Sequence, residues 1–251
     1  MIGGVKFGAT ISLEGSSKTQ HTFRDWDMII ESKVFISEPE AQQNYIEVPG
    51  SNVMLDVSEA ISGHPVFRKR KISFVCSGVV PNRNNWDAKV SRLRNMYEGR
   101  IVHVTFDNDK EYYWRGRLSF TSFERNMEIG RFTVDIPNAD PYKYNIHSNV
   151  DPWLWDTFNF FTGVIPKKPL ITVDGTASIT VPAGSMWTTP TFTVNKITSG
   201  DSIRVSIKGR SYELVRGENY IPSIEINGDA PVTITYTGYG EVLMEYRGGS
   251  L

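Results

Sequence analysis

The chain alternates between apolar and polar side chains over short runs, and Gly, Pro, Asn and Asp separate these runs. In Ile101–Phe106, every second residue from Val102 onward is apolar and falls on one face, a period of two that is typical of a β-strand. Residues that favour strands, namely Val, Ile, Thr, Tyr and Phe, supply most of the runs. The pattern predicts a mainly β protein.

In the first half of the chain we expect strands at 34–36, 70–76, 101–106, 112–120 and 131–136. Asp107–Lys110 has turn chemistry and predicts a hairpin between two of them. The densest basic run, Arg68–Lys71, lies at the start of the expected strand at 70–76. Alternation places Arg70 on the same face of that strand as Ile72 and Phe74. This run is typical of a strand edge protected by lysine and equally of a nucleic-acid patch, so it selects neither function.

One helix is predicted between these strands. Its apolar stripe has the spacing i, i+4, i+7 and i+11 and consists of Trp86, Val90, Leu93 and Tyr97. Asn84 or Asn85 is the expected N-cap, and Gly99 stands where a left-handed residue ends a helix. The opposite face carries Lys89, Arg92 and Arg94, which we interpret as a solvated basic face in preference to a helix that binds nucleic acid.

From Leu170 onward strands are predicted almost throughout, at 171–173, 177–181, 191–194, 202–207, 211–214, 221–226, 232–236 and 241–246. Turn signals lie between them at Asp174-Gly175, at 199–201, at Lys208-Gly209 and at 227–229. Short strands without intervening helices predict an antiparallel β-sandwich.

Prolines mark the stretch between these two regions and disfavour regular structure there. We therefore expect an N-terminal domain at 1–138, a connection at 139–169 and a C-terminal domain at 170–251. Five aromatic side chains crowd the middle of the connection, and either pack on a domain or dock a partner: Trp153, Trp155, Phe158, Phe160 and Phe161.

Composition narrows the function classes. The 251 residues carry a formal net charge of -1, which argues against a dedicated nucleic-acid binder. The single cysteine, Cys76, allows no intramolecular disulfide. We see neither a signal peptide nor an apolar run of membrane-spanning length, so we expect synthesis in the cytoplasm and no membrane partner.

No motif for catalysis, metal binding or cofactor binding stands out. The four histidines are far apart in sequence, and no phosphate-binding or nucleophile motif occurs. Asp107–Glu111 copies the opening of a calcium loop but has Tyr112 in place of its glycine and Leu118 in place of its final glutamate. Scattered carboxylates, among them Asp25, Asp27, Asp151 and Asp156, do not by their spacing identify a glycosidase pair. We expect a protein that is not an enzyme and has no cofactor.

The first half resembles siphophage distal tail proteins (Dit), also described as phage tail components. The landmarks fall in the family's order over roughly residues 1–145 and are Phe35–Glu40, Asn44–Gly50, Leu55–Ala60, Arg68–Phe74, the helix, Tyr112–Leu118 and Ala139–Tyr144. One departs from the pattern, because Lys69 stands in place of the usual asparagine. The second half is similar only in kind, to the galectin-like or carbohydrate-binding-module-like β-sandwich of the family.

The resemblance implies a structural hub in the virion tail, assembled in the host cytoplasm. Copies of the chain would close a hexameric ring between the tail tube protein and a tail hub, fibre or lysin protein, and DNA would pass its channel without base readout. We expect the ring or partner interface at the Glu38–Asn52 stretch and the Asp107–Glu111 tip. The candidate residues are Glu38, Glu40, Gln43, Asn44, Glu47, Asp107, Asp109 and Glu111.

A second hypothesis is a carbohydrate-binding adhesin that contacts a host cell-wall saccharide. Flat aromatic rings stack on sugar faces, and the C-terminal region supplies Trp187 and Tyr239 for this role. The connection adds Trp153 and Trp155. The two hypotheses are compatible, since a hub can carry a sugar-binding module and fold alone does not fix function.

Overall fold

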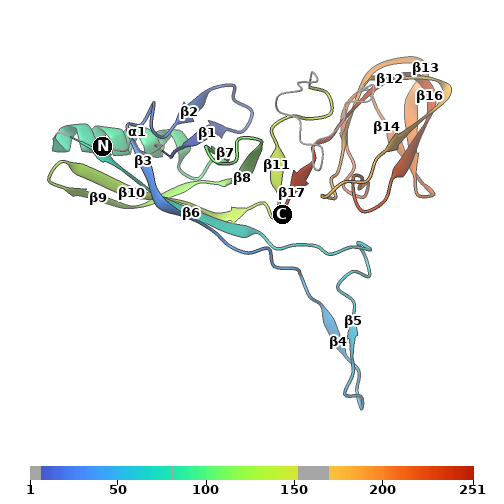
Figure 1. Cartoon of the computed structure of the whole chain (residues 1–251). Coiled ribbons are helices and arrows are strands. Elements are labelled where there is room, and N and C mark those ends of the chain that lie inside the picture. The colour runs from blue at the N-terminus through green and yellow to red at the C-terminus, as the bar shows by residue number, and fades with distance from the viewer. Residues whose placement is uncertain (1–6, 81, 152–169) are drawn as a thin grey trace. The chain divides into compact units, whose positions relative to one another are not determined.

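The computed structural model describes residues 7–80, 82–151 and 170–251 of the chain (Figure 1). The chain forms two compact units, Met1–Lys143 and Tyr144–Leu251, here called unit 1 and unit 2. The expected mainly β architecture is confirmed, and the described residues contain one α-helix. The expected domain limits stay a prediction, and the aromatic residues of the connection lie outside the described residues.

Unit 1 contains two antiparallel sheets around one core. In the first, β8 (Tyr112–Arg117), β7 (Ile101–Phe106), β1 (Ala9–Leu13) and β2 (Thr19–His21) lie in that order. In the second the order is β3 (Ile29–Ile36), β6 (Arg70–Val79), β10 (Ile129–Ala139) and β9 (Ser119–Asn126). Alternate residues of both sheets, such as Val104 and Phe74, meet in one buried cluster. Strand periodicity therefore placed the core face correctly, including the buried position of Arg70.

Helix α1 (Arg83–Tyr97) closes this core with the predicted stripe, and buries Trp86, Leu93 and Tyr97. The predicted N-cap was wrong: Asn82 caps the helix, and its Oδ1 accepts a hydrogen bond of 2.8 Å from the backbone N–H of Asn85. Asn82 is in an extended conformation, which aims its side chain at the free N–H groups of the first turn. Gly99 has the expected left-handed φ of 69°.

The run 112–120 is not one strand as predicted. β8 ends at Arg117 and β9 begins at Ser119, and the two belong to different sheets. Leu118 makes the crossing: it is fully buried, donates its N–H to the Arg100 carbonyl and accepts a bond from the Gly99 N–H. Alternation continues through the crossing, so the sequence pattern alone does not reveal that the chain changes sheet.

Unit 2 is built on β12 (Leu170–Val181), β16 (Val232–Glu245), β13 (Thr191–Ile207) and β14 (Arg210–Leu214) in that order, and β15 (Gly217–Tyr220) also pairs with β13. Apolar side chains from β12, β13, β14 and β16 gather in one core. The short strands β11 (Lys143–Asn145) and β17 (Gly249–Ser250) are linked by the Asn145 N–H, which donates to the Gly248 carbonyl.

Two predictions for unit 2 were wrong. The breaks expected at Asp174-Gly175 and at 199–201 lie inside β12 and β13, where the long strands continue and the register of β13 shifts. The run 221–226 is not a strand, because Pro222 lacks an N–H and the Ile224 N–H closes a turn onto the Ile221 carbonyl. The Lys208-Gly209 turn between β13 and β14 is confirmed.

Candidate assembly surface

A two-stranded arm leaves the second sheet of unit 1 between β3 and β6 (Figure 1). We define the arm as residues 38–68, with β4 (Tyr45–Glu47) and β5 (Met54–Asp56) at its outer end. β4 and β5 pair with each other and with no other described strand. The two connections also pair, through an isolated bridge between Ala41 and Phe67, so the arm is one paired ribbon along most of its length.

One face of the arm is apolar and uncovered. Ile46 lies directly opposite Leu55, so both side chains point to the same face. Val48 and Val53 continue this alternation on either side of the Pro49-Gly50 turn. These four side chains are 52%, 55%, 45% and 72% exposed, in the order named. An isolated two-stranded hairpin is marginally stable in water, and a contiguous exposed apolar face is typical of an interaction surface.

The arm is also acidic. Between Ser37 and Phe67 the sequence contains no lysine or arginine and five carboxylates, at Glu38, Glu40, Glu47, Asp56 and Glu59. Hydrogen bonds from the Ser58 hydroxyl and N–H hold the pKa of the Asp56 carboxyl below its usual value, so this charge persists to lower pH. A partner surface of positive potential would therefore be favoured.

A network of polar contacts holds the root of the arm. The Arg70 side chain, which is buried, donates from Nε to the Ser37 carbonyl at 2.7 Å, and its guanidinium lies 4.8 Å from the centre of the Trp114 ring. Beside it, Lys69 pairs with the buried Asp140 carboxylate. Desolvation lowers the pKa of Arg70, but the guanidinium remains charged at neutral pH because its ordinary pKa is so high.

A second exposed apolar patch lies at one end of the β3–β6–β10–β9 sheet. Ile29, Val79 and Ile129 are 41%, 69% and 56% exposed. They line a shallow hollow of about 620 Å³ together with Phe23 and Arg24. Unit 1 therefore has two separate apolar surfaces that no described residue covers fully.

The structure places the expected interface residues in two groups. The first group lies on the arm and is exposed throughout: Glu38, Glu40, Gln43, Asn44 and Glu47. The second group, Asp107, Asp109 and Glu111, lies on the β7–β8 hairpin. Asp107 contacts His21 Nε2 at 3.2 Å, and Asp109 pairs with Lys143 at 2.7 Å. Glu111 is exposed. The interface role of both groups stays a prediction.

Sequence reasoning missed the apolar face of the arm. The signal was present, since two alternating pairs of apolar residues flank the Pro49-Gly50 turn and mark an amphipathic hairpin. The candidates were instead chosen by their polarity. The apolar residues carry the stronger argument, because exposed carboxylates are ordinary on a protein surface and a row of exposed aliphatic side chains is not.

The two candidate sugar-stacking residues differ in their surroundings. Trp187 is half-buried: its ring packs so closely on Gly228 that a Cβ there would lie 2.2 Å from it, and Lys208 Nζ lies 5.0 Å from the ring centre. Tyr239 is 46% exposed and lies in β16, seven residues after Val232, the first residue of that strand, and Val232 itself follows Gly228. That separation is on the order of 20 Å along an extended strand, so the two rings form no common platform. Sugar binding stays a prediction.

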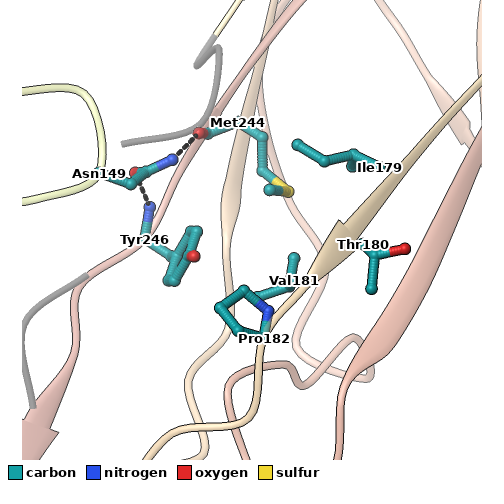
Figure 2. Close-up of a pocket in the computed structure, with 7 residues that line it drawn as sticks. All are labelled: Asn149, Ile179, Thr180, Val181, Pro182, Met244 and Tyr246. Atoms are coloured by element: carbon teal, nitrogen blue, oxygen red, sulfur yellow. Dashed lines mark hydrogen bonds between the residues drawn. The ribbon is translucent and has the colours of Figure 1, made fainter. Parts of the chain in front are cut away.

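A small cavity in unit 2 lies beside Asn149, Val181 and Tyr246 (Figure 2). The Asn149 side chain already donates to the Met244 carbonyl at 2.8 Å and accepts from the Tyr246 N–H at 2.8 Å. The cavity volume is about 80 Å³, well below the roughly 300 Å³ at which ligand pockets begin. Asn149 therefore has a structural role, extending the hydrogen bonding of the β16 end.

Neither metal nor membrane chemistry is visible in the described parts of the chain. Residues 7–80, 82–151 and 170–251 contain no group of three or more His, Cys, Asp or Glu side chains that could hold a metal ion. In the same residues no helix is long and apolar enough to cross a membrane. Burial raises the pKa of the Cys76 thiol well above its usual range, which makes it a poor nucleophile.

Comparison with known proteins gives a likeness in structure and none in sequence. No protein-family model matches the chain, and no curated protein matches it either. The structure is similar to the crystal structure of the SPP1 Dit protein (gp 19.1), described as a paradigm of the hub adsorption apparatus in phages that infect Gram-positive hosts. The TM-score is 0.57 and the identity 13%, over 95% of this chain and 98% of that chain.

A second likeness is to a chain in the tail of an empty GTA particle with C6 symmetry. It covers 55% of this chain and 96% of that chain at 15% identity, but its TM-score of 0.30 is too low to support an argument. The match to SPP1 Dit spans both units and agrees with the ordered landmarks of the sequence. The chain therefore has the fold of a siphophage distal tail protein.

Proposed function

We propose that this protein is a structural subunit of a phage tail tip, where copies of it associate into a hub. The observation that carries the proposal is the arm, whose apolar face of Ile46, Val48, Val53 and Leu55 is left exposed by the described residues of the chain. The fold shared with SPP1 Dit supports the same function. On this proposal the protein is located in the virion tail after assembly in the host cytoplasm, and it is not an enzyme.

Self-association into a ring explains the distribution of the uncovered surfaces. A ring needs two different complementary patches on each subunit, because its interfaces are heterologous. Among the described strands, β3 and β9 are the two outer strands of the β3–β6–β10–β9 sheet, and β3 is partly engaged because its Ile30 N–H donates to the Phe7 carbonyl. An outer strand of one copy can pair with the opposite outer strand of the next. The arm adds a projecting contact to the same neighbour. We propose that six copies close such a ring and form a hexamer.

The ring would connect the tail tube protein to the host-adsorption apparatus, which comprises a tail hub, fibre or lysin protein. Its channel would let DNA pass, and the near-neutral charge of the chain supports contacts to DNA that are weak and do not depend on sequence. The apolar patch at Ile29, Val79 and Ile129 remains available for one of these neighbours.

Size-exclusion chromatography with light scattering tests the proposal directly. We expect a species of about six times the 28.4-kDa monomer, and annular particles by negative-stain microscopy. A protein that stays monomeric at high concentration and low salt would refute self-association.

A sugar-binding role for unit 2 is the second candidate, and the observation in its favour is the exposed ring of Tyr239. A glycan array with the full chain, compared with the Tyr239→Ala variant, tests it. We expect any binding to be lost in the variant, and absence of binding at millimolar glycan would remove this candidate.

A further inference from the structure

The two chain segments at the root of the arm are joined to each other where they enter the second sheet of unit 1. The Ser37 N–H donates to the Lys71 carbonyl at 2.9 Å, and the Lys71 N–H donates to the Ser37 hydroxyl at 3.0 Å. One step further out, the Arg68 N–H donates to the Glu40 carbonyl at 2.8 Å. These bonds make the arm a continuous ribbon, but they do not by themselves fix its direction relative to the rest of unit 1.

Arg70 connects this ribbon to the body of unit 1. Its Nε donates to the Ser37 carbonyl at 2.7 Å, and its Nη1 lies 3.4 Å from the Pro141 carbonyl. The guanidinium also lies against the Trp114 ring of β8. A planar group held on two carbonyls and one ring has little freedom to rotate, and its 7% exposure excludes most water from these contacts.

Asp140 also connects the ribbon to the body of unit 1. Its carboxylate is 8% exposed and receives Lys69 from the arm root on one oxygen and Arg115 from β8 on the other, the latter at 3.3 Å. Arg115 in turn pairs with Glu14 at 2.7 Å. Because the buried carboxylate is shared between the half-exposed Lys69 at the arm root and a neighbouring strand, movement of the arm would remove one of its two cationic partners, which is costly for a buried charge.

We propose that Arg70 and Asp140 act as positioning residues that clamp the arm in one direction, and that this direction sets the number of copies at which the ring closes. The inference rests on the proposed function. In a heterologous ring the rotation from one copy to the next is determined by the angle between the donating and the receiving surface. A clamped arm gives one angle and one ring size, whereas a loose arm permits several ring sizes and open chains.

The direction of the arm can be measured without assembly. Spin labels at Asn52→Cys on the arm tip and Asn95→Cys on α1 are both at exposed positions, and the native Cys76 is buried and will not react. In the Ile46→Ser, Leu55→Ser background, which we expect to be monomeric, pulsed electron paramagnetic resonance should give one narrow distance distribution. Asp140→Asn should broaden it, because Lys69 and Arg115 lose their shared carboxylate.

Glu40→Gln is the matched control, since it removes an arm-root ion pair that is exposed, with Arg68 at 3.8 Å. We expect it to leave the distribution narrow. Arg70→Lys, which keeps the charge but loses the contact to Pro141, is the second test variant if Asp140→Asn fails to fold. An unbroadened distribution in the folded Asp140→Asn or Arg70→Lys variant would overturn the clamp.

Native mass spectrometry of the otherwise unmodified chain then tests the ring size. We expect one stoichiometry in the wild type and in Glu40→Gln, and several stoichiometries in Asp140→Asn. A single, unchanged stoichiometry in Asp140→Asn would overturn the link between arm direction and closure. Failure of the wild type to assemble would refute the proposed function, and the distance measurement would still decide whether the clamp exists.

Discussion

Replacing Ile46 and Leu55 with serine should weaken assembly and leave the fold of the subunit almost unchanged. Both side chains are roughly half exposed in the isolated chain, at 52% and 55%. Full burial of such a side chain is worth about 1.5 to 3 kcal/mol, so covering the remaining half in a partner contributes about 1 kcal/mol for each. The double substitution should cost about 2 kcal/mol for each interface.

An energy of about 2 kcal/mol corresponds to a roughly 30-fold weaker dissociation constant for each interface. Because every copy in a ring contributes one arm, the loss recurs at each interface, and rings should dissociate at concentrations where the wild type remains assembled. The stability of the subunit should change little, since exposed side chains contribute within about 0.5 kcal/mol. Light scattering over a dilution series measures the first effect, and thermal unfolding monitored by circular dichroism the second.

The opposite face of the arm supplies the control. Tyr45 and Met54 are 52% and 53% exposed, which matches the first pair, and alternation points them to the other side of the hairpin. Tyr45→Ser with Met54→Ser should therefore leave the dissociation constant within about threefold of the wild type. If this control dissociates as readily as the Ile46, Leu55 variant, or if that variant assembles normally, the apolar face does not drive association.

Three further predictions concern the fold and the arm. Gly240→Ala should lower the unfolding free energy of unit 2 by about 2 kcal/mol or more in a denaturant titration. The reason is that φ is 156° and the new Cβ would lie 2.1 Å from the Lys196 carbonyl oxygen, and an unfolding free energy equal to that of the wild type would contradict this. The pKa of Asp56, measured by NMR, should lie below the ordinary value of an aspartate, and Ser58→Ala should return it toward that value. Since the folded pKa is the lower one, the stability that Asp56 contributes is present above its unfolded pKa and is lost as the pH falls through the folded pKa. Cys76 should react with a thiol reagent only after unfolding, and rapid reaction in buffer would show that the core opens.

The sequence predicted the local elements of unit 1 well. The period of two located β6, β7 and β10, and the i, i+4, i+7 stripe located α1 and its buried face. These patterns are legible in one sequence because each follows from the geometry of a few consecutive residues, in which side chains on one face recur at a fixed interval. The ordered landmarks also indicated the fold that the match to SPP1 Dit supports.

The sequence was less informative where neighbours distant in the chain decide the outcome. Leu118 continues the alternation of β8 but carries the chain into a second sheet, because the Gly99 and Arg100 backbone groups bind it there. In unit 2 the chain was expected to turn at 199–201, but β13 continues through these residues and only its register with β16 shifts. A local pattern states which side chains share a face, and it does not state which sheet that face joins.

The candidate site shows the same division. From the sequence alone, the stretch Glu38–Asn52 was predicted to be an interface, and the alternation around Pro49-Gly50 encoded an amphipathic hairpin. Only the tertiary structure decided that no other part of the described chain covers Ile46 and Leu55, and that Arg70 and Asp140 hold the arm at its root. The physical reason is that the sequence determines the polarity of a face through local spacing, whereas its coverage depends on contacts between residues far apart in the chain.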